Sequence, residues 1–537
     1  MKKSRIMISL LLVSVLITTL LSGCGSNGAN PTATQSPSEQ IDKTDQTEEP
    51  IEITWTNTMD LAINKSWTTT KLPELLKEKG FNVKFTVNEL GSHDGGEWGD
   101  KFNLMIASGA LPTDIISAGG LNSDAVAAGW YAELNMGLLT KNMPKYVAEV
   151  DRVYPKMWAY SKDPSTGKLY GITSFNMFGP NRHTFVYRQD WLNTLDIEPP
   201  KTIDEFEDFL RLCRETDFNG NGENDEYGYT SGTDSPGAGF SEVFGAFGVM
   251  TQTWLEENGV VARGEVMPGA KSALEVLARW YQEDLIPKGV NTTEKRSDGF
   301  YSGTRGTQGQ ADGYAPALTP SGANYAKLEA QSPGAGLVAV PSFTGPDGLW
   351  GTQEWGPRKY STGFGKHLEK DPEKLEMILQ MLELIATDEE LFVAGMLGEK
   401  GTHWDFVEEG AQSGATKFLE PFTDYNKRLD EVGVREMSES AFAPIWTQEI
   451  YQKYLDPLAI EYSSQNPGYF DALLGISTAE QKQLGTDLDN LTKEAFLEII
   501  TGKKPIDYFD EYVATWYSNG GDEMTKAAQN LYDTVFK

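Results

Sequence analysis

Cysteine is scarce in this sequence, with only Cys24 and Cys213 among 537 residues. A fold held together by a disulfide framework needs several cysteine pairs, so that class of protein is excluded. Cys213 shares a helical face with Phe206, Phe209 and Leu210. This pattern predicts a buried, unreactive thiol.

Histidine is scarce as well, with four residues in the chain. None of them has the spacing to a second ligand that a zinc site requires, and no Ser or Cys lies in a recognisable nucleophile motif. The Asp and Glu residues are numerous enough to contain a pair for glycan cleavage, about 5–10 Å apart across a sugar, but no segment singles one out. These absences favour a binding protein over an enzyme.

Positive charge is also in short supply. Against 78 Asp and Glu there are 46 Lys and Arg, and the formal net charge is −32. So acidic a surface repels nucleic acid and anionic lipid headgroups over about a Debye length. We therefore expect no nucleic-acid partner and no electrostatic binding to membranes. Polyanionic glycans are weakly disfavoured too, unless a local basic pocket near Arg182 or Arg358 overrides the effect.

One apolar run stands at the start of the chain, over residues 6–21, behind three basic side chains. The segment Leu21-Ser22-Gly23-Cys24 follows, which is typical of a secretory signal with small residues at the cleavage site. It resembles the signal of bacterial lipoproteins, in which the cysteine is lipidated and becomes the new N-terminus. The run is shorter than the roughly 20 residues of a spanning helix. We predict a signal peptide over 1–23 and lipidation of Cys24, with an ordinary signal peptide as the alternative.

A polar segment separates this signal from the rest. Residues 24–50 consist mainly of Ser, Thr, Asn, Gln, Pro and Glu. Because such a composition cannot bury enough apolar surface to fold, we predict a disordered tether, followed by a folded body over 51–537. The protein is thus expected at the extracellular face of the bacterial cell membrane, held there through its lipid only.

Strand and helix patterns alternate at the start of the body. Residues 51–55 and 83–87 alternate apolar and polar side chains, residues 114–117 form a short apolar strand, and helical patterns lie between them. This order predicts an α/β fold with a parallel sheet covered by helices. Ligands of such sheets bind beyond the carboxyl ends of the strands, which places Thr56, Asn57 and Gly119-Gly120 at a prospective binding edge.

Two later helices have clear start signals. Thr202 and Glu205 form a capping box ahead of the apolar face that includes Cys213. Asp371-Pro372 begins a second helix, which carries apolar side chains on one side as far as Ile385.

The sharpest chemical motif is the segment 217–226. Oxygen-bearing side chains stand at relative positions 1, 3, 5, 9 and 10, and Gly222 at position 6 permits a sharp turn. Ca²⁺ takes roughly six to eight oxygen ligands, and residue 7 of such loops offers its backbone carbonyl. Position 12 is Gly228 instead of the bidentate Glu of an EF-hand, so Glu226 would take that role. We predict a structural calcium ion held by Asp217, Asn219, Asn221, Glu223, Asp225 and Glu226; a plain Asn/Gly turn with solvated acids is the alternative.

Four stretches follow one another in a recognisable order after the signal and tether. They are Asp100 to Gly109 with the strand at 114–116, Gly167 to Ile172 through Tyr187 to Leu192 into the capping box and the 217–226 loop, Asp371 to Ile385 with Gly401 to Trp404, and Ile499 to Ile506 with Trp516 and Gly520-Gly521. Together they resemble the family 1 extracellular solute-binding lipoproteins of ABC importers, in the oligosaccharide-binding branch with a calcium loop.

The resemblance implies a two-lobed periplasmic-binding-protein-like fold of type II, with the ligand cleft between the lobes. Lobe 1 is expected over about 51–165 and 305–385, and lobe 2 over about 166–304 and 386–537. Hinge motion would close the lobes on the ligand, and ABC permease subunits in the membrane would recognise the closed form. The implied function is that of a monomeric, non-enzymatic carrier that captures a carbohydrate, an oligosaccharide, for this transporter.

Aromatic side chains are plentiful, with 13 Trp, 22 Tyr and 24 Phe. A sugar ring packs its apolar face on an aromatic plane, while its hydroxyls need hydrogen-bond partners. Candidate ligand contacts lie at strand ends and in loop-like segments, with core packing or ordinary surface as the alternative for each: Trp55, Asn57, Arg182, Trp350, Trp355, His403, Trp404 and Trp446.

Two other functions remain open at this point. One is a surface-anchored, calcium-dependent enzyme that cleaves glycans, and the other is a sugar-sensing co-receptor that reports to a membrane kinase. Glycan binding without turnover distinguishes a carrier from the enzyme.

Overall fold

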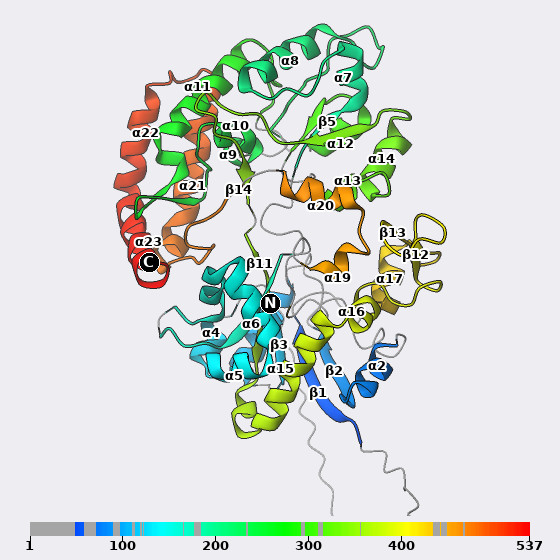
Figure 1. Ribbon diagram of the computed structural model, residues 1–537. Coiled ribbons are helices and arrows are strands. Elements are labelled where there is room, and N and C mark those ends of the chain that lie inside the picture. Colours follow the sequence, from blue (N-terminus) through cyan, green and yellow to red (C-terminus); the bar gives the residue numbers. More distant parts are fainter. Residues whose placement is uncertain are drawn as a thin grey trace, which may run out of the picture. The chain divides into compact units, whose positions relative to one another are not determined.

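The computed structural model describes residues 49–57, 71–89, 97–109, 113–118, 121, 123–164, 166–176, 184–231, 235–290, 296–309, 315–354, 356–432, 441, 448–465 and 468–537. The folded body starts at Glu49. The expected signal peptide, Cys24 and nearly all of the expected tether lie outside the described residues. Among the helices described, none is both long enough and apolar enough to cross a membrane. The body has two lobes, each with its own sheet and hydrophobic core (Figure 1).

The first lobe is built on a five-stranded sheet with the order β2-β1-β3-β11-β4. Its strands are β1 (Ile51–Asn57), β2 (Val83–Glu89), β3 (Ile115–Ala118), β4 (Gly171–Phe175) and β11 (Arg358–Phe364). β1 pairs in parallel with β2 and β3, whereas β11 is antiparallel to β3 and to β4. The predicted parallel pairing is thus confirmed for β1, β2 and β3, whereas the antiparallel β11 makes the whole sheet mixed. The carboxyl ends of β1 to β4 and the amino end of β11 lie at one edge.

Helices cover both faces of this sheet, as the alternation within β3 shows. Ile115 packs into the main core of the lobe, with apolar side chains of α2 (Leu72–Glu78), α6 (Pro144–Val153) and α15 (Pro372–Thr387). Ile116 faces the opposite way and packs with Phe102 of α3 (Glu97–Ser108). α15 begins as predicted, because the side chain of Asp371 accepts a hydrogen bond from the backbone of Lys374.

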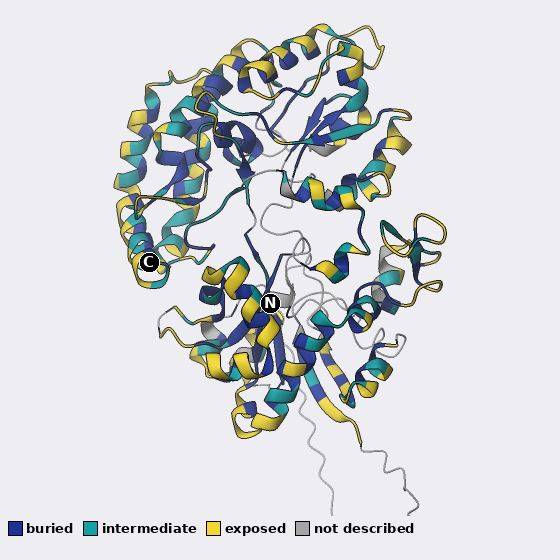
Figure 2. Ribbon diagram, viewed as in Figure 1, coloured by how far each residue is buried: buried dark blue, intermediate teal, exposed yellow. Residues whose placement is uncertain are grey.

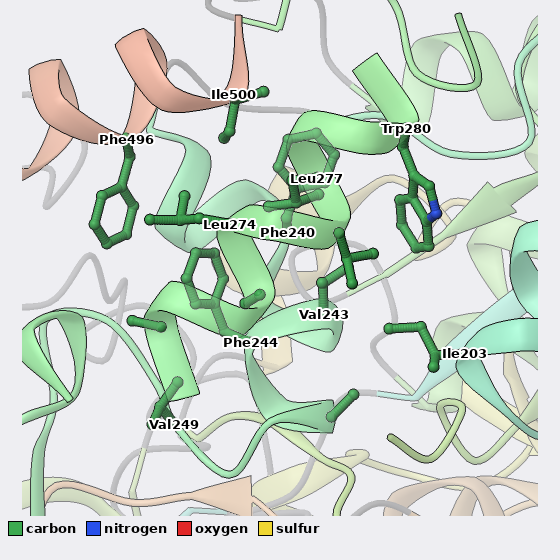
Figure 3. Close-up of a cluster of buried hydrophobic side chains, with 14 of the residues drawn as sticks. Ile203, Phe240, Val243, Phe244, Val249, Leu274, Leu277, Trp280, Phe496 and Ile500 are labelled. Atoms are coloured by element: carbon green, nitrogen blue, oxygen red, sulfur yellow. The ribbon is translucent and has the colours of Figure 1, made fainter. Parts of the chain in front are cut away.

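The second lobe holds a three-stranded antiparallel sheet with the order β8-β5-β9. The strands are β5 (Phe185–Arg188), β8 (Thr307–Gln308) and β9 (Leu337–Val340). Helices α8 (Ile203–Glu215), α10 (Ser241–Ala246), α11 (Pro268–Gln282) and α21 (Ala479–Ile500) supply most of its core. Figure 3 shows Phe244, Leu277 and Phe496 from three of these helices turned into one cluster. The capping box at the start of α8 is present, and Cys213 is a buried free thiol whose pKa burial raises.

The remaining described elements are shorter or lie around the two sheets; Figure 2 shows exposed residues on the outer faces of the helices and buried ones within the sheets. They are α4 (Ser123–Ala127), α5 (Met136–Asn142), η2 (Pro155–Ser161), α7 (Gln189–Leu195), α9 (Pro236–Gly239), β6 (Trp254–Glu257), β7 (Val260–Arg263), η3 (Gly264–Val266), α12 (Arg296–Ser302), α13 (Ala315–Leu318), α14 (Ala323–Gln331), β10 (Thr352–Gln353), η4 (Lys366–Lys370), α16 (Glu389–Met396), β12 (Trp404–Phe406), β13 (Thr416–Phe418), α17 (Tyr425–Val432), α19 (Glu449–Gln452), α20 (Pro457–Ser464), β14 (Gly468–Tyr469), α22 (Tyr508–Trp516), η6 (Tyr517–Gly521) and α23 (Asp522–Val535).

The strand partners divide the chain between the lobes differently from the expected ranges. β4 lies beyond residue 165 but belongs to the first-lobe sheet, because it pairs with β11. β8 and β9 were expected in the first lobe, yet both pair with β5 in the second. The short strands β10 and β14 pair in parallel where the chain passes between the lobes. Hydrogen-bond partners far along the chain therefore set the lobe boundaries, and a sequence pattern does not reveal them.

Candidate functional site

The carboxyl edge of the first-lobe sheet is the candidate binding surface, since α/β sheets bind ligands at this edge. β1 ends there at Asn57, as predicted from the sequence, and β4 ends at Phe175. Asn176 follows, and its backbone and side-chain N–H groups donate to the carbonyls of Pro357 and Gly356 at 2.5 and 3.2 Å. This pair of hydrogen bonds fixes the start of β11, where Arg358 lies opposite Phe175.

Trp55 lies in the core instead of at this edge. Its side chain is fully buried, its indole N–H donates to Ser117 Oγ at 2.9 Å, and its ring is 6.0 Å from that of Phe85. Strand alternation explains the position, because Trp55 faces the same way as Ile53 into the main core. The alternation itself was the signal that could have assigned Trp55 to packing rather than to ligand contact.

His403 and Trp404 are also packed. Trp404 belongs to a small hydrophobic cluster around the β12–β13 hairpin, and His403 directly precedes β12 and is buried as well. Trp404 is 2% exposed, and its indole N–H donates to the carbonyl of Gly398 at 3.1 Å. His403 accepts a hydrogen bond from the backbone N–H of Glu399 at 2.8 Å and packs against Phe422; burial lowers its pKa. These two buried side chains therefore pack at the hairpin and do not join the candidate surface.

The other predicted contacts divide into one described residue and three outside the described part. Trp350 is half-buried and lines a pocket of about 660 Å³ with second-lobe residues that include Asn193, Pro200 and Val340. Trp350 stays a candidate contact. Its pocket, however, is lined by residues of the second lobe, whereas the ends of β1 and β4 belong to the sheet of the first lobe. Arg182, Trp355 and Trp446 lie outside the described residues.

An aromatic group next to the start of β11 escaped the sequence analysis. The guanidinium of Arg358 lies over the ring of Tyr160, 4.9 Å from its centroid. Tyr154 packs edge-on against Phe470 at 6.1 Å, and the ring of Phe470 fills the space where Gly356 has no side chain. Burial and the nearby Glu354 raise the pKa of Tyr154 to about 12, so its hydroxyl stays protonated.

This aromatic group borders a pocket and comes from distant parts of the chain. Tyr154 and Phe470 line a pocket of about 480 Å³ together with Tyr469 and Asp471. Residues 154–160, 358 and 470 are brought together only by folding, so no local pattern announces them. Their combination of aromatic planes with a few polar groups is typical of small-molecule sites.

The 217–226 loop forms a compact turn whose oxygens gather around one another. Asp217 accepts hydrogen bonds from the backbone N–H groups of Gly220, Asn221 and Gly222 at 2.7–3.2 Å. Asp225 Oδ1 lies 3.3 Å from the side-chain amides of both Asn219 and Asn221. The glycines at 220 and 222 have φ of 71° and 86°, in the left-handed region that glycine adopts freely.

Glu226 is the unusual member of this loop. It is fully buried, and its Oε1 accepts a hydrogen bond from the backbone N–H of Asn219 at 3.0 Å. Its Oε2 is buried and has no hydrogen-bond partner among the described residues. An unsatisfied buried carboxylate oxygen is costly, and an ion that binds there would remove the cost.

The surroundings of the loop explain its departure from the EF-hand spacing. A side chain at Gly228 would come within 2.6 Å of Leu210 and 3.3 Å of Cys213, so packing against α8 leaves no room for a glutamate at position 12. Arg214 of α8 holds the loop by donating to the carbonyls of Asn224 and Glu226 at 2.6 and 2.9 Å. Within the described residues, no group of three or more His, Cys, Asp or Glu surrounds a common metal position.

Comparison with known proteins gives relatives over most of the chain, although no protein-family model matches it. Lipoprotein LipO of Bacillus subtilis (strain 168) is 25% identical over 479 residues, which cover 86% of this chain and 88% of that protein. The polygalacturonan/rhamnogalacturonan-binding protein YtcQ of the same organism is 22% identical and covers 82% of this chain and 83% of its own length.

Solved structures share the fold along nearly the whole body. An HMO binding ABC-transporter associated solute binding protein from Bifidobacterium longum infantis superposes with a TM-score of 0.64 at 17% identity, covering 91% of this chain and 100% of that one. The Streptococcus pneumoniae ABC-transporter substrate binding protein FusA, as an EF-hand mutant in complex with fructo-nystose, gives a TM-score of 0.57 at 16% identity over 90% of this chain and 99% of its own. These findings confirm the two-lobed fold and the family resemblance predicted from the sequence. The chain is thus similar, along most of its length, to a lipoprotein, to a glycan-binding protein and to solute-binding proteins of ABC transporters.

Proposed function

We propose that this protein is a lipid-anchored extracellular binding protein that captures an oligosaccharide and delivers it to the permease subunits of an ABC transporter. The observation that carries the proposal is the match along more than four fifths of the chain to a relative that binds glycans, YtcQ. The fold also supports it, because lobes joined by short crossing segments such as β10 and β14 can close on a ligand by hinge motion.

The candidate surface fits a sugar. Tyr154 and Phe470, which line the pocket of about 480 Å³, provide aromatic planes for the apolar faces of sugar rings. Asn57 at the end of β1 and Trp350 in the second lobe remain proposed contacts. Arg182, Trp355 and Trp446 are retained as proposed contacts on their sequence positions alone.

Titration calorimetry with a panel of oligosaccharides tests this function. The panel should contain fructo-oligosaccharides, oligogalacturonates, alginate oligomers and N-glycan fragments. We expect saturable binding of at least one class, with a dissociation constant in the micromolar range or below, and no new product by chromatography after prolonged incubation. Heat-denatured protein is the control. Product release would assign an enzyme instead, and failure to bind every class would contradict the proposal.

We propose that a structural calcium ion occupies the 217–226 loop. The residues present fit the ion: Asp217, Asp225 and Glu226 supply negative charge, and Asn219 and Asn221 can add amide oxygens. The unpartnered Oε2 of Glu226 supports this assignment most directly. Glu223 is proposed to contribute its backbone carbonyl only. Bound calcium would fix the loop against α8 and have no contact with the sugar.

We propose that Cys24 carries the lipid and that the 24–50 segment lets a monomeric body reach its permease. Anchoring raises the local concentration of loaded protein at the membrane. In cells, Cys24→Ser is expected to move the protein from the membrane fraction to the medium, as measured by immunoblotting of the two fractions, without a change in glycan affinity. Retention of the Cys24→Ser protein in the membrane fraction would contradict lipidation at this position.

A further inference from the structure

Two buried arginines of this protein, Arg188 and Arg263, have their guanidinium groups paired with carboxylates. Arg188 is 4% exposed and donates two hydrogen bonds to the carboxylate of Asp190, at 3.0 and 2.7 Å. Arg263 donates to Glu265 at 2.8 Å and to Asp489 at 2.9 Å. Paired forks of this kind are what make a buried guanidinium tolerable. With 78 acidic residues in the chain, such partners are easy to supply.

Arg358 has no such carboxylate partner among the described residues. Its side chain is half-buried, and it lies over the ring of Tyr160 at 4.9 Å. No carboxylate and no carbonyl among the described residues accepts a hydrogen bond from it. Burial lowers the pKa of its guanidinium, and only the phenol of Tyr160 opposes that effect. The cation–π contact replaces only part of the lost hydration, and no acceptor among the described residues takes the N–H groups of the half-buried fork, which stay available to a ligand.

Arg358 lies at the candidate binding edge, where its guanidinium can pair with a ligand. It is the first residue of β11, at the same edge as the carboxyl ends of β1 and β4. Its guanidinium lies over the ring of Tyr160 at this edge. Because a stacked guanidinium donates hydrogen bonds within its own plane, its free edge suits a planar carboxylate. At this edge, such a carboxylate can come from the ligand.

We propose that the captured oligosaccharide is acidic, carrying uronate residues, and that Arg358 pairs with one of its carboxylates. This inference rests on the proposed function and adds the charge of the ligand to it. It also explains how a protein with a net charge of −32 takes up an anion: the attraction is confined to one desolvated site, where charges interact more strongly than across an acidic, hydrated surface.

Matched acid and ester ligands test the inference. Trigalacturonate and trimannuronate are titrated into the protein by calorimetry beside their fully methyl-esterified forms, together with a sulfated neutral trisaccharide. The wild-type protein is expected to bind one uronate about tenfold or more tightly than its ester, because the ester removes the charge-assisted hydrogen bonds. In Arg358→Met this preference should disappear while the ester binds as before. Arg358→Lys keeps the charge but loses the planar fork, so it should retain only part of the preference.

Arg152→Met is the matched control, because Arg152 is exposed, lies in the same lobe and, in the described part of the chain, pairs only with Glu149 on its own helix. This variant should keep the full preference for the acid. Melting curves separate ligand pairing from a role in folding. Since no carboxylate or carbonyl of the described residues loses a hydrogen bond in this variant, and methionine can still pack on the ring of Tyr160, Arg358→Met should melt at the wild-type temperature or above it.

Each remaining outcome decides the question. Equal affinity of the wild-type protein for acids and esters, or an acid preference that survives in Arg358→Met, overturns the inference but leaves oligosaccharide capture standing. A preference for the sulfated sugar over both uronates overturns the carboxylate assignment. A fall in the melting temperature of Arg358→Met by several degrees assigns Arg358 to the fold instead. Failure to bind any glycan in the wider panel removes the proposed function and this inference together.

Discussion

Chelation of calcium is expected to lower the melting temperature of the protein by roughly 5–10 °C, and added Ca²⁺ is expected to restore it. An ion present at a hundredfold excess over its dissociation constant stabilises the folded state by about 2.7 kcal/mol. In a lobe of this size each kcal/mol corresponds to about 2–4 °C. The ion would act through Glu226, whose buried Oε2 has no hydrogen-bond partner. Calorimetric melting curves in EDTA and in millimolar Ca²⁺ measure the effect.

Two glutamates of the loop provide a matched pair of variants for this prediction. Glu226→Gln removes the charge at the buried position, so the difference between EDTA and Ca²⁺ should shrink or vanish. Glu223→Gln changes an exposed side chain whose residue is assigned only a backbone carbonyl, so the full difference should remain. Identical curves of the wild-type protein in EDTA and in Ca²⁺ would remove the ion and leave a plain turn.

Features that depend on neighbouring residues were predictable from the sequence. The capping box of Thr202 and Glu205 and the start of α15 at Asp371 follow local rules, and both are present. The three strands β1, β2 and β3 and their parallel pairing follow from alternation and spacing, and the burial of Cys213 follows from the apolar face of α8.

Features that depend on distant partners were not predictable. The indole ring of Trp55 is of a kind on which sugars stack. The face of β1 that carries it is, however, covered by Phe85 of β2 and by other core residues. Trp404 similarly covers the inside of a hairpin. Conversely, the contact of Arg358 with Tyr160 joins positions almost two hundred residues apart, and only the sheet register brings them together. Residue type alone therefore identified candidates, while packing selected among them.

Replacement of Asp114 by alanine is expected to cost the first lobe about 3–5 kcal/mol of unfolding free energy. Asp114 is 2% exposed and accepts four hydrogen bonds or ion-pair contacts. Its Oδ2 accepts from the backbone N–H and the hydroxyl of Thr54 at 2.7 and 2.9 Å. Its Oδ1 lies 2.9 Å from both His367 Nε2 and Lys374 Nζ. The carboxylate thus ties β1 and β3 to η4 and α15.

Urea unfolding measures this cost, and Asp371→Asn is its control. Asp371 is a neighbouring exposed carboxylate that caps α15, and asparagine caps a helix as well as aspartate does, so this variant should lose less than about 0.5 kcal/mol. If Asp114→Ala unfolded at the same urea concentration as the wild-type protein, the contacts of Asp114 would contribute nothing to stability.

The contribution of Asp114 should also depend on pH in a defined direction. Burial acts to raise its pKa, but hydrogen bonds from Thr54, Lys374 and His367 outweigh burial and hold the pKa below the ordinary value of 3.8. A carboxyl group with a depressed pKa stabilises the fold fully above its unfolded pKa and loses this effect as the pH falls through its folded pKa. The free-energy difference between the wild-type protein and Asp114→Asn should therefore be constant above about pH 5 and shrink below about pH 4. A difference that grew on acidification would mean that Asp114 is protonated in the native state. The ion pair of Asp114 with Lys374 would then not connect β1 to α15.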